Sequence, residues 1–243
     1  MTELLTIDPR SFVLRDLQPA VRTLLEGGVV AAATASYYAL MVIADRPTAL
    51  ENLFWIKYGR RPGHGWPEKD SPGDRNSFLL LLDSRERVGA YAQEVPKEAD
   101  ALMDRYWPGL LTIIFKAQTG LHPAILGKRK SSIGLRVDGF PVPGALARMT
   151  DRGVTGTSAN PHGRPPAASA REVLSYFQGR LDMVVDTGPA PGGSKGKAKG
   201  KPSTIVDATR HPFSIVREGA ISGKEILRAL GAPGKGQGAA HGS

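Results

Sequence analysis

Short runs of branched and aliphatic residues recur along the chain, and each is followed closely by glycine, proline or a polar residue. Such runs are typical of short buried strands. They lie at 77–83, 110–117, 131–137, 183–188, 203–208 and 213–219. Helical patterns separate them at irregular intervals, without a clean βαβ rhythm. We therefore expect an α/β or α+β fold with a mixed, twisted sheet flanked by helices.

The expected helices have recognisable local signals. They lie at 13–26, 47–59, 84–107 (two helices broken near Pro96), 143–150 and 170–178. The first helix ends at Gly27 and Gly28, and its apolar face carries Leu17, Val21, Leu24 and Leu25. In the second, Thr48 and Glu51 have the spacing of a capping box. Residues 29–42 are predicted to form a short apolar strand that runs into a turn.

Charge and composition limit the class of partner. The 243 residues carry a formal net charge of +9, which favours phosphate-bearing partners such as nucleotides or RNA. The chain has no cysteine, so disulfides and thiol chemistry are excluded. Its N-terminus lacks the pattern of a signal peptide, and no apolar run reaches the ~18 residues of a membrane span. We expect a soluble cytoplasmic protein without a membrane partner.

Three segments are predicted to lie outside the regular elements. Residues 63–75 are polar and rich in glycine and proline, which indicates a surface loop. Residues 192–202 are rich in glycine and lysine and are expected to form a flexible basic loop. Residues 231–243 form a low-complexity tail. Solvated linkers are the simpler interpretation of the last two, although the lysines could attract phosphate.

Several common chemistries are disfavoured by the motifs that are missing. The sequence has no P-loop, no G-x-G-x-x-G turn opening a helix and no G-x-S-x-G elbow. Its five histidines are scattered without metal-ligand spacing, so we expect no metal site built from protein ligands. Hydroxyl, amide and basic residues near the ends of strands remain, and they suit the binding of polyanions.

Five segments occur in an order that resembles the YrdC/Sua5/YciO family. They are WPGLLTIIF, SSIGLRV, TSANPHGRPP, KPSTIVDAT and IVREGA. The resemblance covers roughly residues 10–222 as a YrdC-like domain and leaves 223–243 as a short, mostly flexible C-terminal extension. The segments YAL and KRKSSIGLRV are most similar to the YciO-like branch. The resemblance implies a twisted mixed sheet around a basic concave cavity.

The family resemblance also implies a reaction. Similar proteins are threonylcarbamoyl-AMP synthases, which convert ATP, L-threonine and bicarbonate to threonylcarbamoyl-AMP and pyrophosphate, with Mg²⁺ on the ATP phosphates. A partner transferase then completes N6-threonylcarbamoyladenosine (t6A) in tRNA. The family has also been described as binding double-stranded RNA. The chain is thus expected to be a nucleotidyltransferase whose charged side chains stabilise phosphate without a protein nucleophile.

Site residues follow from the resemblance by position. The residues implied to bind ATP are Lys57, Arg61, Asn76, Ser132, Ser158, Asn160 and Arg217. Those implied to bind threonine are Ser36, Arg136 and Ser203. Lys57, Arg61 and Arg217 would stabilise phosphate charge. Gly163 would permit close approach of the backbone to the nucleotide.

Three departures from the family pattern support an alternative function. Ala35 stands where the family has an acid, and Ala39 stands where it has a glycine. An alanine at position 39 would be strained if that position required a positive φ. The segment 63–75 is an insertion. The alternative is a catalytically weak or inactive paralogue that binds nucleotide or double-stranded RNA.

Overall fold

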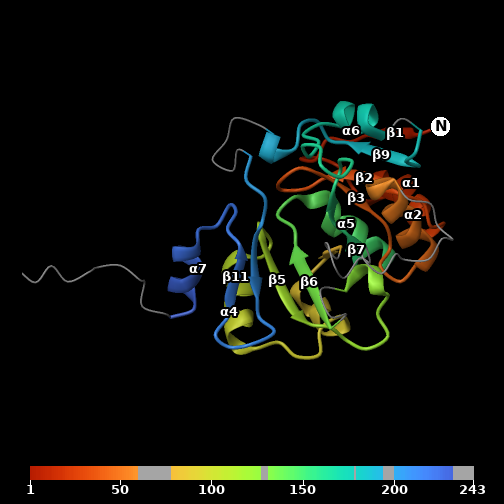
Figure 1. Ribbon diagram of the computed structural model, residues 1–243. Helices are drawn as coiled ribbons and strands as arrows, with labels where there is room; N and C mark the ends of the chain where they lie inside the picture. Colours follow the sequence, from red (N-terminus) through yellow and green to blue (C-terminus); the bar gives the residue numbers. More distant parts are fainter. Residues whose placement is uncertain (60–77, 127–130, 178, 194–199, 232–243) are drawn as a thin grey trace, which may run out of the picture.

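The computed structural model describes residues 1–59, 78–126, 131–177, 179–193 and 200–231. Its strands form two sheets, of five and six strands, and helices flank both. In Figure 1, β1, β9, β2 and β3 lie in the upper half of the molecule, and β5, β6 and β11 lie in the lower half. The predicted mixed α/β fold is confirmed, with its strands divided between two sheets.

The five-stranded sheet joins three strands from the first 41 residues to two strands from residues 157–186. Its order is β1 (Glu3–Thr6), β9 (Met183–Asp186), β2 (Val30–Ala33), β3 (Tyr38–Met41) and β8 (Thr157–Ser158). The strands β1, β9 and β2 are parallel, whereas β3 is antiparallel to both β2 and β8. Strand β1 begins at residue 3, before the limit of residue 10 taken from the sequence.

The six-stranded sheet contains most of the strands that the sequence predicts. Its order is β11 (Ser214–Arg217), β10 (Thr204–Asp207), β5 (Leu111–Lys116), β6 (Ser132–Val137), β4 (Leu80–Leu82) and β7 (Val154–Thr155). Pairing is parallel for β10 with β5 and for β4 with β6, and it is antiparallel elsewhere. As a result, the start of β5 and β10 and the end of β6 and β11 meet at one end of the sheet.

Helices cover the sheets on several sides. They are α1 (Gln18–Leu25), α2 (Pro47–Tyr58), α4 (Lys97–Tyr106), α5 (Pro141–Thr150), α6 (Ala170–Phe177) and α7 (Gly223–Ala229). Short 3₁₀ helices lie at η1 (Leu14–Leu17), η2 (Arg85–Ala90), η3 (Pro123–Ile125) and η5 (Pro191–Gly193). Helix α7 packs against α4. No helix among the described residues is long and apolar enough to cross a membrane.

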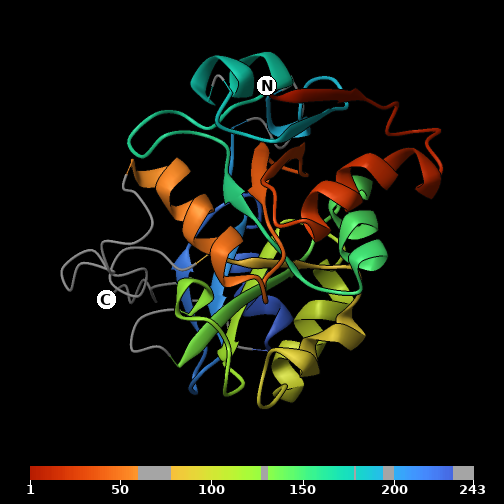
Figure 2. The same ribbon diagram turned by 90° about the vertical axis from the view of Figure 1, so that its right-hand side faces the viewer.

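Strand alternation divides the buried side chains into two cores. Ala31, Leu40 and Val184 face the larger core, which also contains side chains of α2 and α4. Their strand neighbours Ala32 and Met41 face the smaller core, under α1 and α5. Figure 2 shows α2 on one side of these strands and α1 and α5 on the other.

The chain passes directly from one sheet to the other at Gly156. Strand β7 pairs with β4, and two residues later β8 pairs with β3 of the other sheet. A Cβ at Gly156 would lie 2.8 Å from Leu81 Cγ and 2.9 Å from Leu79 Cδ1. Glycine therefore lets the connection pass close to β4, and it brings Ser158 and Asn160 to the start of β3.

Several local predictions are wrong in detail. Residues 29–42 form two strands, because the apolar run after the turn returns as β3 beside β2. Leu25, the last residue of α1, is 39% exposed and does not belong to the buried face of that helix. Helix α2 begins at Pro47 after an Arg46 N-cap without a side-chain hydrogen bond, so Thr48 and Glu51 form no capping box.

The predicted loop at 63–75 lies outside the described residues, as do residues 194–199 of the expected basic loop and residues 232–243 of the tail. The domain limits 10–222 and 223–243 stay predictions.

Candidate functional site

Lys57 joins the end of α2 to the loop that follows β8. Its Nζ donates hydrogen bonds to Ser158 O (2.6 Å), Asn160 Oδ1 (2.9 Å) and Ser158 Oγ (3.1 Å). The Asn160 amide nitrogen donates in turn to Pro161 O and Arg164 O, which fixes the orientation of its oxygen toward Lys57. The structure thus brings together three of the predicted ATP-binding residues.

The ammonium group of Lys57 is buried against neutral oxygens. The residue is 6% exposed, and the three hydrogen bonds that its ammonium donates to described residues all go to uncharged acceptors. Desolvation by burial lowers the pKa of Lys57 to about 8. An anion placed beside the ammonium would reverse this shift, because an opposite charge favours the protonated form. Ser158, which is exposed, lies on the side from which such an anion could approach.

One face of the six-stranded sheet carries the candidates that lie on β6. Side chains two residues apart on a strand share a face, so Ser132, Gly134 and Arg136 of β6 project together. The β5–β6 register pairs Ile114 with Gly134, and its continuation places Thr112 opposite Arg136. The intervening residues Ile133 and Leu135 face the larger core. The predicted residues Ser132 and Arg136 therefore share the face that lies away from that core.

Ser203 and Arg217 form a second group at one end of this face. Arg217 donates from Nε (3.2 Å) and Nη2 (2.8 Å) to Ser203 O, and Nη2 also lies 3.2 Å from Ser203 Oγ. Ser203 Oγ in turn lies 3.0 Å from Thr112 Oγ1, and both hydroxyls are buried. Arg217 keeps an exposed surface, yet partial burial of its guanidinium, and then the nearby charge of Arg136, lowers its pKa.

Asp138 connects Arg136 with the turn between β2 and β3. Arg136 Nη2 lies 2.6 Å from Asp138 Oδ2, and both side chains are almost fully buried. Asp138 Oδ1 accepts hydrogen bonds from Ala35 N (2.7 Å) and Phe140 N (2.9 Å). Because Ala35 belongs to the five-stranded sheet and Arg136 to the six-stranded sheet, this carboxylate joins the two.

The turn at 34–37 lies between the Lys57 group and the Arg136 group. Strand β3 begins at Tyr38, whose carbonyl accepts from Ala159 N beside Ser158. At the other side, Ala35 N contacts Asp138. Ser36 Oγ lies 3.1 Å from Thr34 Oγ1 inside the turn. Ser36, Lys57 and Arg136 are thus linked through one continuous set of contacts.

The departure at Ala39 causes no strain. Ala39 lies in β3, where it pairs with Ala32 and Ser158. Asp151 is the one non-glycine residue with a positive φ in the described part of the chain. Gly163 does have a positive φ, of +84°, but a Cβ there would meet no atom within 4 Å. A glycine at 163 is therefore favoured by backbone conformation, and the close approach of its backbone to a nucleotide stays a prediction.

Not every predicted residue joins the site. Ser132 stands on the same face as Arg136 but roughly 13 Å farther along β6, at 3.3 Å per residue. Arg61 and Asn76 lie outside the described residues. Sequence reasoning missed Asp138, although its position two residues after Arg136, next to a glycine, is typical of a turn-forming acid.

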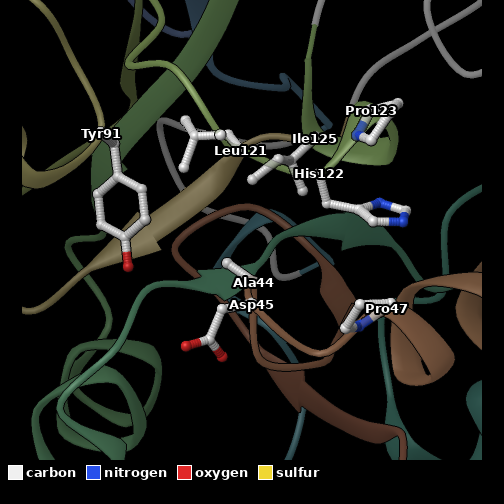
Figure 3. A pocket seen from close by; sticks show the side chains of 9 residues that line it. Ala44, Asp45, Pro47, Tyr91, Leu121, His122, Pro123 and Ile125 are labelled. Carbon is white, nitrogen blue, oxygen red and sulfur yellow. The ribbon is translucent and has the colours of Figure 1, made fainter.

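A cavity of about 320 Å³ lies elsewhere and includes none of these residues. It is lined by Ala44, Asp45, Pro47, Tyr91, Gly120, Leu121, His122, Pro123 and Ile125. Figure 3 shows Tyr91 and Asp45 on one side of it and His122 and Pro47 on the other. Asp45 is already paired with Arg152 (2.6 Å). We do not assign the candidate site to this cavity, because Lys57, Arg136 and Arg217 do not line it.

The structure is an α/β domain in which the cationic side chains of Lys57 and Arg217 each contact hydroxyl groups. A family model named Sua5_yciO_yrdC, described as "Telomere recombination", matches residues 22–219. The chain belongs to the Sua5/YciO/YrdC family. This finding confirms the resemblance drawn from the five sequence segments.

Three curated relatives are named threonylcarbamoyl-AMP synthase. The chain is 28% identical to a threonylcarbamoyl-AMP synthase of Pyrococcus abyssi over 85% of this chain and 54% of the relative. It is 31% identical to a threonylcarbamoyl-AMP synthase of Marinobacter nauticus over 77% of this chain and 88% of that relative. The chain thus spans about half the length of the archaeal relative and most of the length of the bacterial one.

Solved structures agree on the fold. The P. abyssi Sua5 structure complexed with L-threonine is 24% identical, with a TM-score of 0.79 over 95% of this chain and 61% of that one. Escherichia coli YciO is also 24% identical, with a TM-score of 0.75 over 95% of this chain and all of that one.

Proposed function

We propose that the protein is an ATP-dependent L-threonylcarbamoyladenylate synthase. It would convert ATP, L-threonine and bicarbonate to threonylcarbamoyl-AMP, pyrophosphate and water. The names of the curated relatives support this reaction. The observation that carries the proposal is the contact of Lys57 with both Ser158 and Asn160, on a path of contacts that continues through the turn 34–37 to Arg136.

The phosphate side of the site is proposed to be formed by Lys57, Ser158, Asn160 and Arg217. A phosphate at Lys57 would replace Ser158 Oγ, whose hydrogen bond is the longest of the three at 3.1 Å. Each charge-assisted hydrogen bond contributes about 1.5–3 kcal/mol net, so two cations and their neighbours suffice to hold a polyphosphate. Arg61 and Asn76 are proposed to belong to the same side, and Ser132 to the nucleoside end, by resemblance.

The threonine side is proposed to involve Ser36, Arg136 and Ser203. The similar P. abyssi Sua5 is complexed with L-threonine, which supports an amino-acid subsite here. The carboxylated amino group of threonine would attack the α-phosphorus, and pyrophosphate would leave with the bonding electron pair. No protein nucleophile is needed, because the protein aligns two substrates and neutralises phosphate charge.

Mg²⁺ is proposed to enter with ATP. The described residues contain no group of three or more His, Cys, Asp or Glu side chains that could hold a metal ion. The cationic groups at Lys57 and Arg217 fit the phosphates rather than a bare cation. When bound, Mg²⁺ would neutralise charge on the leaving pyrophosphate. We further propose that the product serves a t6A transferase that modifies tRNA in the cytoplasm.

Pyrophosphate release tests the reaction. Wild-type protein with ATP, Mg²⁺, bicarbonate and L-threonine should release pyrophosphate above the level of an Arg217→Ala variant, and omission of L-threonine should abolish the signal. The absence of any difference would remove the synthase proposal. Salt-sensitive binding of duplex RNA under the same conditions, without pyrophosphate release, would instead support the inactive RNA-binding paralogue.

A further inference from the structure

The buried carboxylate of Asp138 contacts residues from both sheets. Its side chain is completely buried, and its Oδ1 accepts from Ala35 N at 2.7 Å across 103 residues of sequence. The bond from Phe140 N is local and fixes the orientation of the carboxylate. The other oxygen, Oδ2, lies 2.6 Å from Arg136 Nη2. A shift of Asp138 would therefore move Arg136 and the turn 34–37 relative to each other.

The two guanidinium groups near Asp138 outnumber its single negative charge, so one further anionic group would balance them. Two guanidinium groups, Arg136 and Arg217, are close enough for Arg136 to lower the pKa of Arg217. Asp138 supplies one negative charge beside Arg136 and next to the turn at Ala35. Arg136 Nε is buried and donates no hydrogen bond to any residue that the structure describes. A ligand carboxylate would neutralise the remaining charge and accept from the guanidinium.

Ser36 offers the complementary group on the other side. Thr34 Oγ1 donates its single proton to Tyr37 O at 2.7 Å. In the 3.1 Å contact between the Thr34 and Ser36 hydroxyls, Ser36 must therefore donate. No residue in the described part of the chain donates to Ser36 Oγ, so its lone pairs could accept from an amine. An acceptor and a guanidinium, one from each sheet, match the amino and carboxylate ends of one amino acid.

The small side chain of Ala35 leaves space beside the Asp138 carboxylate. A Cβ added at Gly139 would lie 3.7 Å from Ala35 Cβ and 3.3 Å from Gly109 Cα, so the turn packs closely against the segment after β6. An acid at position 35 would bring a second carboxylate next to Asp138, whose oxygen already contacts the Ala35 nitrogen. In this chain the carboxylate belongs to Asp138, and it accepts a hydrogen bond from the backbone nitrogen of Ala35.

We propose that Asp138 is a positioning residue for the amino-acid subsite. It fixes the position of Arg136 relative to the turn that carries Ser36, and it acts through these two groups without touching the substrate. This assignment rests on the proposed function, because the subsite is the one that would take L-threonine.

Two variants and one matched control test the assignment. Asp138→Asn keeps the shape and the acceptor for Ala35 N but removes the charge that faces Arg136. Asp138→Glu keeps the charge paired, so it stays informative if the asparagine variant does not fold. Asp207→Asn is the control. Asp207 Oδ1 accepts a hydrogen bond from Thr209 N, two residues later, as Asp138 Oδ1 does from Phe140 N. Asp207 lies at the other end of β10 from Ser203.

Calorimetric titrations with L-threonine and with Mg·ATP, each without bicarbonate, measure the two subsites separately. We expect both Asp138 variants to bind L-threonine roughly ten- to a hundred-fold more weakly, with ATP affinity within about two-fold of wild type and Asp207→Asn unchanged. Wild-type affinity for L-threonine in both Asp138 variants, or an equal loss for both ligands, would overturn the assignment. Wild-type protein that binds ATP but not L-threonine would instead overturn the proposed substrate, and this assignment with it.

Discussion

Binding of a polyphosphate at Lys57 should take up a proton from solution. The pKa of Lys57 in the free protein is about 8, because the ammonium is desolvated. At pH 8 about half of the molecules therefore lack this proton, and at pH 7 about one tenth do. A unit negative charge about 4 Å away contributes about 4 kcal/mol at an effective dielectric constant near 20, equivalent to about three pKa units. The bound state would then be fully protonated.

The expected uptake at Lys57 is about 0.5 proton per pyrophosphate at pH 8 and about 0.1 at pH 7. Calorimetric titration in two buffers of different ionisation enthalpy measures this number directly. A Lys57→Arg variant corrects for protons taken up by the ligand itself, because arginine stays charged at both pH values. Pyrophosphate affinity of the wild type should also fall as the pH rises above 8. Equal proton uptake by wild type and Lys57→Arg at pH 8 would refute the placement of phosphate beside Lys57.

Three further predictions concern stability and charge. Gly156→Ala should lower the free energy of unfolding by about 1–3 kcal/mol in urea denaturation, because its Cβ would meet Leu81 Cγ at 2.8 Å; a loss below about 0.5 kcal/mol would show that β4 yields easily. Between pH 8 and 10.5 the Lys57 side chain keeps its proton in the unfolded state but loses it in the folded state. The free energy of unfolding of the wild type should therefore rise with pH relative to Lys57→Met, by up to about 3 kcal/mol. A flat difference between the two pH profiles would contradict the lowered pKa. Arg217→Ala should reduce kcat/KM for ATP about 10- to 100-fold, whereas Arg228→Ala on the exposed side of α7 should not, and equal effects of the two would indicate only a general loss of positive charge.

The sequence by itself determined most of the elements and the family. Apolar runs such as 110–117 and 131–137 became β5 and β6, because alternation and branching act over a few residues and need no distant partner. Five ordered segments were enough to indicate the family that the family model then confirmed. The grouping of Lys57 with Ser158 and Asn160 was also expected, although their binding roles stay predictions.

Tertiary structure alone decided how these segments meet. Residues 29–42 became a hairpin because β3 gains partners on both sides, β2 and β8, and β8 lies more than a hundred residues away. The need for glycine at 156 depends on Leu81, and the position of Asp138 depends on Ala35, 103 residues earlier. Such contacts leave no periodic signal in the chain. The free energy of these contacts comes from buried hydrogen bonds and ion pairs that form only after the two sheets have packed together. The local sequence pattern therefore could not indicate that Asp138 contacts both Arg136 and the turn that carries Ser36.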